Sequence, residues 1–136
     1  MNLKIPSALL AAIAAALGLL GPASQPDPIE AARHNNLGCA YMNQQLFEKG
    51  LKEFQLALES DPKFTTARLN EGVAYMNLQK VDEAKAALED ALKQDPKNPN
   101  AWYGLGLLSK NTGDAQASID AFRRVTEIDP NDADTW

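Results

Sequence analysis

The chain has 136 residues, of which 45% are hydrophobic and 23% charged, a composition typical of one globular domain and not of a disordered chain. One cysteine excludes an intramolecular disulfide and a cysteine-rich metal site, and one histidine leaves little material for metal binding, so we expect neither a metal nor a cofactor. The net charge of −5 argues against nucleic acid as a partner, because phosphate binding requires a basic surface.

The N-terminal segment has the pattern of a secretory signal peptide. Lys4 supplies a positive charge, residues 8–20 form an uninterrupted apolar run, and Gly-Pro-Ala at 21–23 lies where a signal peptidase would cleave. We therefore assign residues 1–23 to a signal peptide and expect an exported protein, either periplasmic or secreted. The alternative is an uncleaved N-terminal helix that anchors the protein, although the run is shorter than the ~20 residues that span a membrane. In that case the protein meets the membrane only through this segment.

Residues 24–30 form a short linker and the start of the first helix. Asp27 is a favoured residue before a helix, Pro28 is favoured at the first helical position, and Glu30 places a negative charge in the first turn. This combination predicts that a helix begins at Pro28.

From residue 31 onward the sequence repeats with one fixed period. Asp-Pro recurs at 61–62, 95–96 and 129–130, and glycine recurs at 38, 72 and 106. The string Ala-Tyr-Met-Asn occurs at 40–43 and again at 74–77. These positions give a period of 34, a size that is typical of a stacked repeat array. The copies are 31–64, 65–98 and 99–132, and 133–136 begin an incomplete fourth copy.

Each copy predicts two helices. Apolar residues at helical spacing, together with an Asp-Pro that ends each second helix, predict helices over 28–44, 47–60, 65–78, 81–94, 99–111 and 115–128. Asn98 followed by Pro99 predicts a capped start for the fifth of these helices. A glycine in the middle of a helix costs about 1 kcal/mol relative to alanine. We therefore expect a neighbouring helix to approach each such glycine closely.

Residues 31–132 resemble tetratricopeptide repeats, a family whose repeat unit carries Trp, Leu-Gly and Tyr on a first helix and Ala, Phe and a terminal Pro on a second. The third copy matches this pattern at Trp102, Leu105, Gly106, Phe122 and Pro130. The resemblance implies an all-α fold in which tandem antiparallel helix hairpins stack into a right-handed superhelix. It also implies that the first helices line a concave groove that binds a peptide or helix of a partner protein.

The candidate groove residues lie on the first helices, on the face away from the glycines. They are Asn36, Met42, Asn43, Leu69, Asn70, Val73, Met76, Asn77, Tyr103, Leu107, Lys110 and Asn111. Asparagine amides can pair with a peptide backbone, but the asparagines at 43, 77 and 111 have the alternative role of stabilising helix ends. Asn70 lies in mid-helix, where asparagine is unfavourable, so it is the predicted polar anchor. Its loss should weaken binding and leave folding little affected.

One subtype of the family does not fit this sequence. Some members clamp the C-terminal carboxylate of heat-shock chaperones with Lys, Asn and Arg at set groove positions. Those positions hold Asn35, Cys39, Asn70, Asn100 and Gly104 in this chain. The basic residues that would neutralise a carboxylate are missing, so we do not expect this mode of binding.

The sequence carries no motif of a common enzyme class: it has no phosphate-binding loop, no His-Glu-x-x-His and no Gly-x-Ser-x-Gly. We therefore expect a non-catalytic protein-interaction scaffold and not an enzyme. The alternative is a structural or self-associating assembly module. The last predicted helix favours this alternative, or a longer array, because one neighbour could not cover all of its apolar residues, which are Ile119, Phe122, Val125 and Ile128.

Overall fold

The computed structural model describes residues 25–130, which form six α-helices and no strand. The helices are α2 (Pro28–Asn43), α3 (Phe47–Ser60), α4 (Thr65–Asn77), α5 (Val81–Gln94), α6 (Pro99–Thr112) and α7 (Ala115–Ile128). Each boundary lies within one residue of the predicted one. The predicted signal peptide and the start of the fourth copy lie outside the described residues.

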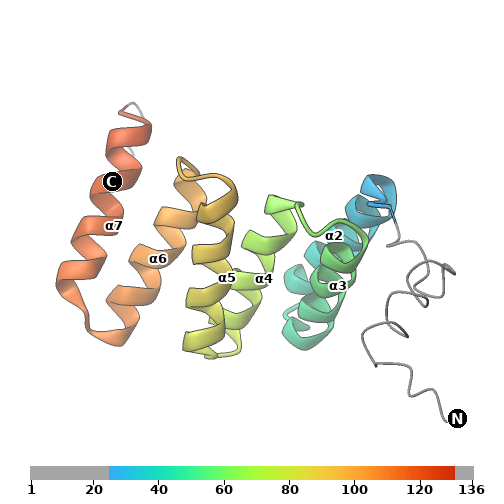
Figure 1. Ribbon diagram of the computed structural model, residues 1–136. Helices are drawn as coiled ribbons and strands as arrows, with labels where there is room; N and C mark the ends of the chain where they lie inside the picture. Colours follow the sequence, from blue (N-terminus) through green and yellow to red (C-terminus); the bar gives the residue numbers. More distant parts are fainter. Residues whose placement is uncertain (1–24, 131–136) are drawn as a thin grey trace, which may run out of the picture.

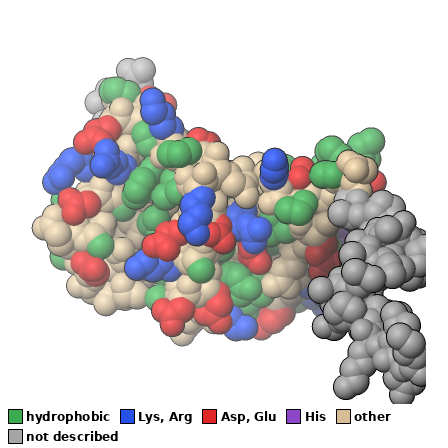
Figure 2. All heavy atoms as spheres, viewed as in Figure 1, with side chains coloured by type: hydrophobic (Ala, Val, Ile, Leu, Met, Phe, Trp, Pro, Cys, Tyr) green, Lys and Arg blue, Asp and Glu red, His purple; other side chains and the backbone are tan. Residues whose placement is uncertain are grey.

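The helices pair as hairpins that stand side by side in a row, from α2 at one end to α7 at the other (Figure 1). The Asp27 N–H donates a hydrogen bond of 2.8 Å to the Ser60 carbonyl, which places the start of α2 beside the end of α3. The predicted all-α fold of tandem antiparallel hairpins is confirmed. Acidic and basic side chains are interspersed over the face seen in Figure 2. Within residues 25–130 no helix is both long and apolar enough to cross a membrane.

The helix ends follow the local signals in the sequence. The Asp27 carboxylate accepts hydrogen bonds from the Ile29 and Glu30 N–H groups, and the Asn98 side chain accepts one from the Ala101 N–H. These bonds satisfy donors that a helix start leaves without a partner. The second helix of each copy ends one residue before the aspartate of Asp-Pro, and that aspartate, at 61, 95 and 129, is the C-cap.

The turn inside each hairpin requires a left-handed backbone. Gly113 adopts φ 84°, while Gln45 and Gln79, its equivalents in the first two copies, adopt φ 59° and 58°. A side chain in this conformation costs about 1–2 kcal/mol. The Gln45 N–H donates a hydrogen bond of 2.9 Å to the Met42 carbonyl, and the Gln79 N–H donates one of 3.0 Å to the Met76 carbonyl. The left-handed turn position is common to all three copies.

The mid-helix glycines lie where a large side chain from the second helix of the same copy packs against the first, a phenyl ring at Gly38 and Gly106 and Leu88 at Gly72. A Cβ on Gly38 would lie 2.5 Å from Phe54 Cε1, and a Cβ on Gly106 would lie 2.6 Å from Phe122 Cε1. The predicted close approach is confirmed. Around these contacts the core consists mainly of fully buried alanines, with Phe54 and Leu88 as its largest fully buried side chains.

One ion pair in the second copy is largely withdrawn from solvent. Arg68 Nη1 lies 2.9 Å from Glu71 Oε2, and Glu71 is only 7% exposed. The Nε of Arg68 is buried and has no hydrogen-bond partner among the described residues. Arg68 occupies the repeat position that Trp102 fills in the third copy, so a charged residue stands where the third copy places an aromatic one.

Candidate functional site

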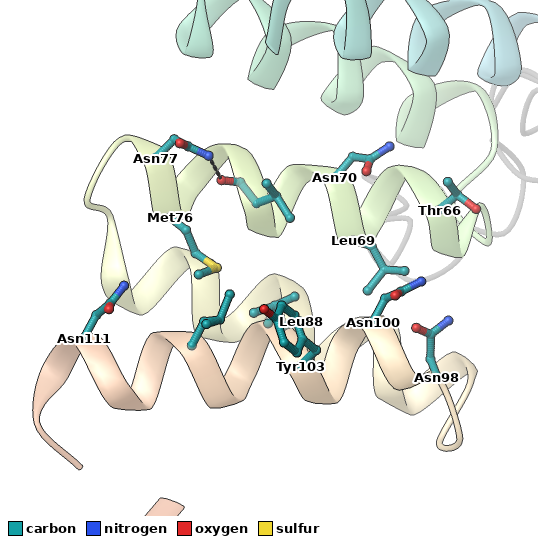
Figure 3. Close-up of a pocket in the computed structure, with 13 residues that line it drawn as sticks. Thr66, Leu69, Asn70, Met76, Asn77, Leu88, Asn98, Asn100, Tyr103 and Asn111 are labelled. Carbon is teal, nitrogen blue, oxygen red and sulfur yellow. Dashed lines mark hydrogen bonds between the residues drawn. The ribbon is translucent and has the colours of Figure 1, made fainter. Parts of the chain in front are cut away.

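The candidate site is a groove of about 670 Å³ between α4 and α6, with Leu88 of α5 at its floor (Figure 3). We call it the α4–α6 groove. Its walls are Thr66, Leu69, Asn70, Val73, Met76 and Asn77 from α4, and Asn98, Asn100, Tyr103, Gly104, Leu107 and Asn111 from the start and length of α6. Most of these residues form pairs that are one repeat period apart. The same repeat positions on two successive first helices therefore face one another.

The α4–α6 groove contains no charged side chain. None of its 13 lining residues is acidic, basic or histidine, although the chain carries 13 basic and 18 acidic residues. Leu69, Val73 and Met76 provide apolar surface, and Val73 is 43% exposed. Such a surface can hold apolar side chains and form hydrogen bonds through amides. It offers no carboxylate, imidazole, thiol or amine for acid–base or nucleophilic chemistry.

Gly104 opens the groove. Its equivalent in the second copy is Asn70, whose Nδ2 donates a hydrogen bond of 2.8 Å to Asn35 Oδ1 and lies 3.5 Å from Cys39 Sγ. That side chain bridges α4 and α2. Gly104 has no side chain to bridge α6 and α4, and even a Cβ there would lie 3.0 Å from Leu88 Cδ2. The space above Leu88 therefore stays open.

Asn70 lines the groove, but it does not present a free amide to it. Its amide nitrogen is bonded to the buried Asn35, and Figure 3 shows the side chain directed away from α6. The Asn77 amide nitrogen donates to the Val73 carbonyl at 2.9 Å, the dashed line in Figure 3. Asn100 and Asn111 form no side-chain hydrogen bond within residues 25–130. These two amides therefore have all their hydrogen-bonding groups open to a ligand, whereas the predicted anchor Asn70 uses its amide nitrogen in the contact with Asn35.

The structure brings together eight of the twelve predicted groove residues, those of the second and third copies other than Lys110. Lys110 lines a smaller neighbouring pocket with Tyr103, Leu107, Phe122, Arg123 and Thr126. The three residues predicted from the first copy lie outside the α4–α6 groove. Asn36 and Asn43 are exposed on α2, whereas Met42 is half-buried and packs against a core cluster. The cluster consists of Leu51, Phe54 and Ala74.

Sequence reasoning missed three lining residues, which are Thr66, Leu88 and Asn98, and it named Asn100 and Gly104 only as groove positions of the chaperone-binding subtype. Thr66 and Asn100 are one repeat period apart on the groove face, so the period could have identified them. Leu88 belongs to a second helix, and its place at the groove floor depends on the missing side chain at Gly104. No local sequence signal could have revealed that contact.

The titratable groups with shifted pKa values lie outside the α4–α6 groove. Hydrogen bonding to the Arg33 guanidinium lowers the pKa of Glu30, and hydrogen bonding to Asp90 raises the pKa of Lys93. None of these side chains lines the α4–α6 groove. Among residues 25–130 no three His, Cys, Asp or Glu side chains gather in a way that could hold a metal ion.

Comparison with known proteins gives a family and a set of similar folds. A family model described as tetratricopeptide repeat matches residues 35–84 and 69–133. No curated protein sequence matches the chain.

Solved structures of tetratricopeptide repeat (TPR) domains share the fold. The first TPR of Spaghetti (RPAP3), bound to the HSP90 peptide SRMEEVD, has a TM-score of 0.75 at 19% identity, over 79% of this chain and 86% of that one. The Sgt2 TPR domain from Aspergillus fumigatus has a TM-score of 0.75 at 26% identity, over 82% of this chain and 74% of that one. MamA has a TM-score of 0.71 at 20% identity, over 79% of this chain and 63% of that one.

Proposed function

Because the chain belongs to the tetratricopeptide repeat family, whose model matches most of its length, we propose that it is a non-catalytic protein-interaction scaffold. Its ligand is an extended, uncharged peptide segment of a partner protein, which binds in the α4–α6 groove. The observation that carries this proposal is the groove itself, an open and partly apolar surface without charge in a protein whose surface is otherwise rich in charge.

The similar structures support a peptide ligand but not the same peptide. Two TPR domains of RPAP3 are described as bound to the HSP90 peptide SRMEEVD, which carries three acidic residues and a C-terminal carboxylate. The α4–α6 groove has no lysine or arginine to pair with such charges. Burying an unpaired carboxylate is strongly unfavourable, so the ligand of this chain is a different kind of segment.

The two free amides set the length of the segment. Asn100 and Asn111 are eleven residues apart on one helix, which at 1.5 Å per residue separates them by about 16 Å. An extended chain covers that distance with about five residues at ~3.3 Å each. We infer that the amides bond to the backbone near the two ends of such a segment, while alternate side chains contact Leu69, Val73 and Leu107.

Two charge substitutions in the full chain test the proposal. Peptides selected from a random display library should be uncharged and apolar at alternate positions, and Val73→Glu should weaken their binding by about tenfold or more, equivalent to about 1.4 kcal/mol. Ile119→Glu is the matched control, because Ile119 is 54% exposed on α7 and lies outside the groove. Fluorescence polarisation measures the dissociation constants, and circular dichroism checks that both variants fold.

The proposal fails if selected peptides bind the folded Val73→Glu variant as tightly as the original chain. It also fails if Ile119→Glu weakens binding to the same degree, since the ligand would then contact the last helix.

Self-association is the second candidate function, favoured by the apolar surface of α7. Val125 is buried, but Ile119 is 54% exposed, and Phe122 and Ile128 are half-buried. A second copy could cover this surface. Sedimentation at several concentrations tests it: a mass that rises with concentration, and that falls to the monomer value in Ile119→Glu, supports assembly. A constant monomer mass excludes it.

We also propose that the protein is exported, with the membrane-anchored form as the alternative. The support is the sequence pattern of residues 1–23. N-terminal sequencing of the exported protein tests cleavage after Ala23. An intact N-terminus in a membrane fraction would favour the anchor.

A further inference from the structure

A second groove lies on the opposite side of α6. It has a volume of about 590 Å³ and is lined by α5, α6 and α7, and we call it the back groove. Its α6 residues are Trp102, Leu105, Leu108, Ser109 and Thr112, none of which lines the α4–α6 groove. With 3.6 residues per turn these five positions occupy the other face of the helix. The back groove is therefore a separate surface, independent of the proposed peptide site.

The repeat itself indicates what is missing from the back groove. Ser109 stands one repeat period after Tyr75, and Tyr75 stands one period after Tyr41. Tyr75 packs against a core cluster, and its hydroxyl accepts a hydrogen bond of 3.1 Å from Gln55 Nε2. The third copy thus lacks a tyrosine that the other two copies carry at this position.

The residues that surround Tyr75 have equivalents in the back groove. Tyr75 lies beside, or in the same cluster as, four residues, which are Leu51, Gln55, Ala74 and Leu78. Their equivalents in the next repeat all line the back groove and are Lys85, Glu89, Leu108 and Thr112. The groove therefore includes the place that a tyrosine ring occupies one repeat earlier.

The charges around the back groove favour a basic ligand. Four carboxylates line it, from Asp82, Glu89, Asp114 and Asp120, against the cations of Lys85 and Arg124. Arg124 pairs at 3.1 Å with Glu127 and Asp120 pairs at 3.2 Å with Arg123, both partners lying outside the groove, and Lys85 is 3.9 Å from Glu89. The lining is thus net negative around an apolar floor that includes Trp102 and Leu105.

We propose that the back groove binds a basic segment of a partner protein through one tyrosine side chain of that segment. The ring takes the place that Tyr75 fills in the second copy, and its hydroxyl donates a hydrogen bond to the Glu89 carboxylate. Basic residues beside the tyrosine pair with Asp82 and Asp114. An aromatic side chain that fills a pocket within a complementary charged rim is a common anchor of protein interfaces.

A tripeptide titration with the full chain tests the proposal. The probe is acetyl-Arg-Tyr-Arg-amide, and the controls are acetyl-Arg-Ala-Arg-amide and acetyl-Glu-Tyr-Glu-amide. Amide chemical shifts report where each peptide binds. The probe should shift signals from residues 81–89 and 105–121 and should bind at least about fivefold more tightly than either control.

Three variants connect the binding to the groove. Ser109→Tyr places the chain's own tyrosine ring in the back groove, so it should weaken binding of the probe by about tenfold. Ser109→Ala keeps the groove open and should leave binding of the probe unchanged. Glu89→Lys removes the hydrogen-bond acceptor of the tyrosine hydroxyl and reverses the charge of an exposed side chain, so it should also weaken binding of the probe. It tests the proposal even if Ser109→Tyr does not fold. The proposal is overturned if the alanine peptide binds as well as the probe, or if the shifts map to the α4–α6 groove. It is also overturned if Glu89→Lys, together with Ser109→Tyr where that variant folds, binds the probe as tightly as the original chain.

Discussion

Replacing Asn70 by alanine should destabilise the fold, contrary to the expectation from sequence that folding would be little affected. The Asn70 amide nitrogen donates a hydrogen bond of 2.8 Å to Asn35 Oδ1, and Asn35 is only 7% exposed. The alanine variant leaves the Asn35 oxygen buried without this donor. An unsatisfied buried polar group costs about 1–3 kcal/mol.

The matched control is Asn111→Ala, because Asn111 is exposed on α6 and forms no side-chain hydrogen bond within residues 25–130. Thermal unfolding followed by circular dichroism should place the Tm of Asn70→Ala about 4–12 °C below that of the original chain. Asn111→Ala should melt within about 2 °C of it, since exposed substitutions change stability by less than about 0.5 kcal/mol. In the peptide-binding assay we expect the larger loss of affinity for Asn111→Ala, because this variant removes an amide that contacts the peptide.

A double variant separates the lost hydrogen bond from other effects of the substitution. Asn35→Leu combined with Asn70→Ala removes both polar partners and copies the leucine that the second copy carries at the position of Asn35, residue 69. It should recover most of the stability lost by Asn70→Ala, because replacing both partners by apolar groups is close to neutral. Equal melting temperatures for Asn70→Ala and Asn111→Ala would refute the reasoning, and so would a double variant that loses the sum of two single effects.

Three further predictions concern the scaffold, each measured by urea unfolding. Gln79→Gly should stabilise the fold by about 0.5–1 kcal/mol, since residue 79 has φ 58° and glycine adopts this conformation without strain; unchanged stability would contradict it. Gly106→Ala should destabilise by about 1–3 kcal/mol despite better helix propensity, because the new Cβ would lie 2.6 Å from Phe122 Cε1; a stabilised variant would show that the ring moves freely. Arg68→Trp combined with Glu71→Leu should stabilise by about 1–4 kcal/mol, as an apolar pair replaces a largely buried ion pair; a loss of stability would mean that the ion pair is net stabilising.

The architecture could be predicted from the sequence because its signals are local and occur three times. A helix end before Asp-Pro and an apolar stripe occur in every copy, and a capping residue followed by proline starts α2 and α6; each is decided within a few residues of chain. The period of 34 then indicated that the hairpins stack, and all six helices of residues 25–130 begin and end within one residue of the expected positions. Eight of the groove residues followed from the same period.

Tertiary structure decided which of the repeated faces is open. Asn70 and Gly104 occupy the same repeat position, but only the former reaches across to a neighbouring helix, where it bonds to Asn35. Met42 and Met76 are also equivalent, yet one packs into the core cluster and the other lines the groove. These outcomes depend on distances between helices that lie a whole repeat apart along the chain. Which side chains fill the space between two such helices, and which form hydrogen bonds across it, depends on the packing of the helices. Equivalent positions in a repeat therefore need not have equivalent roles.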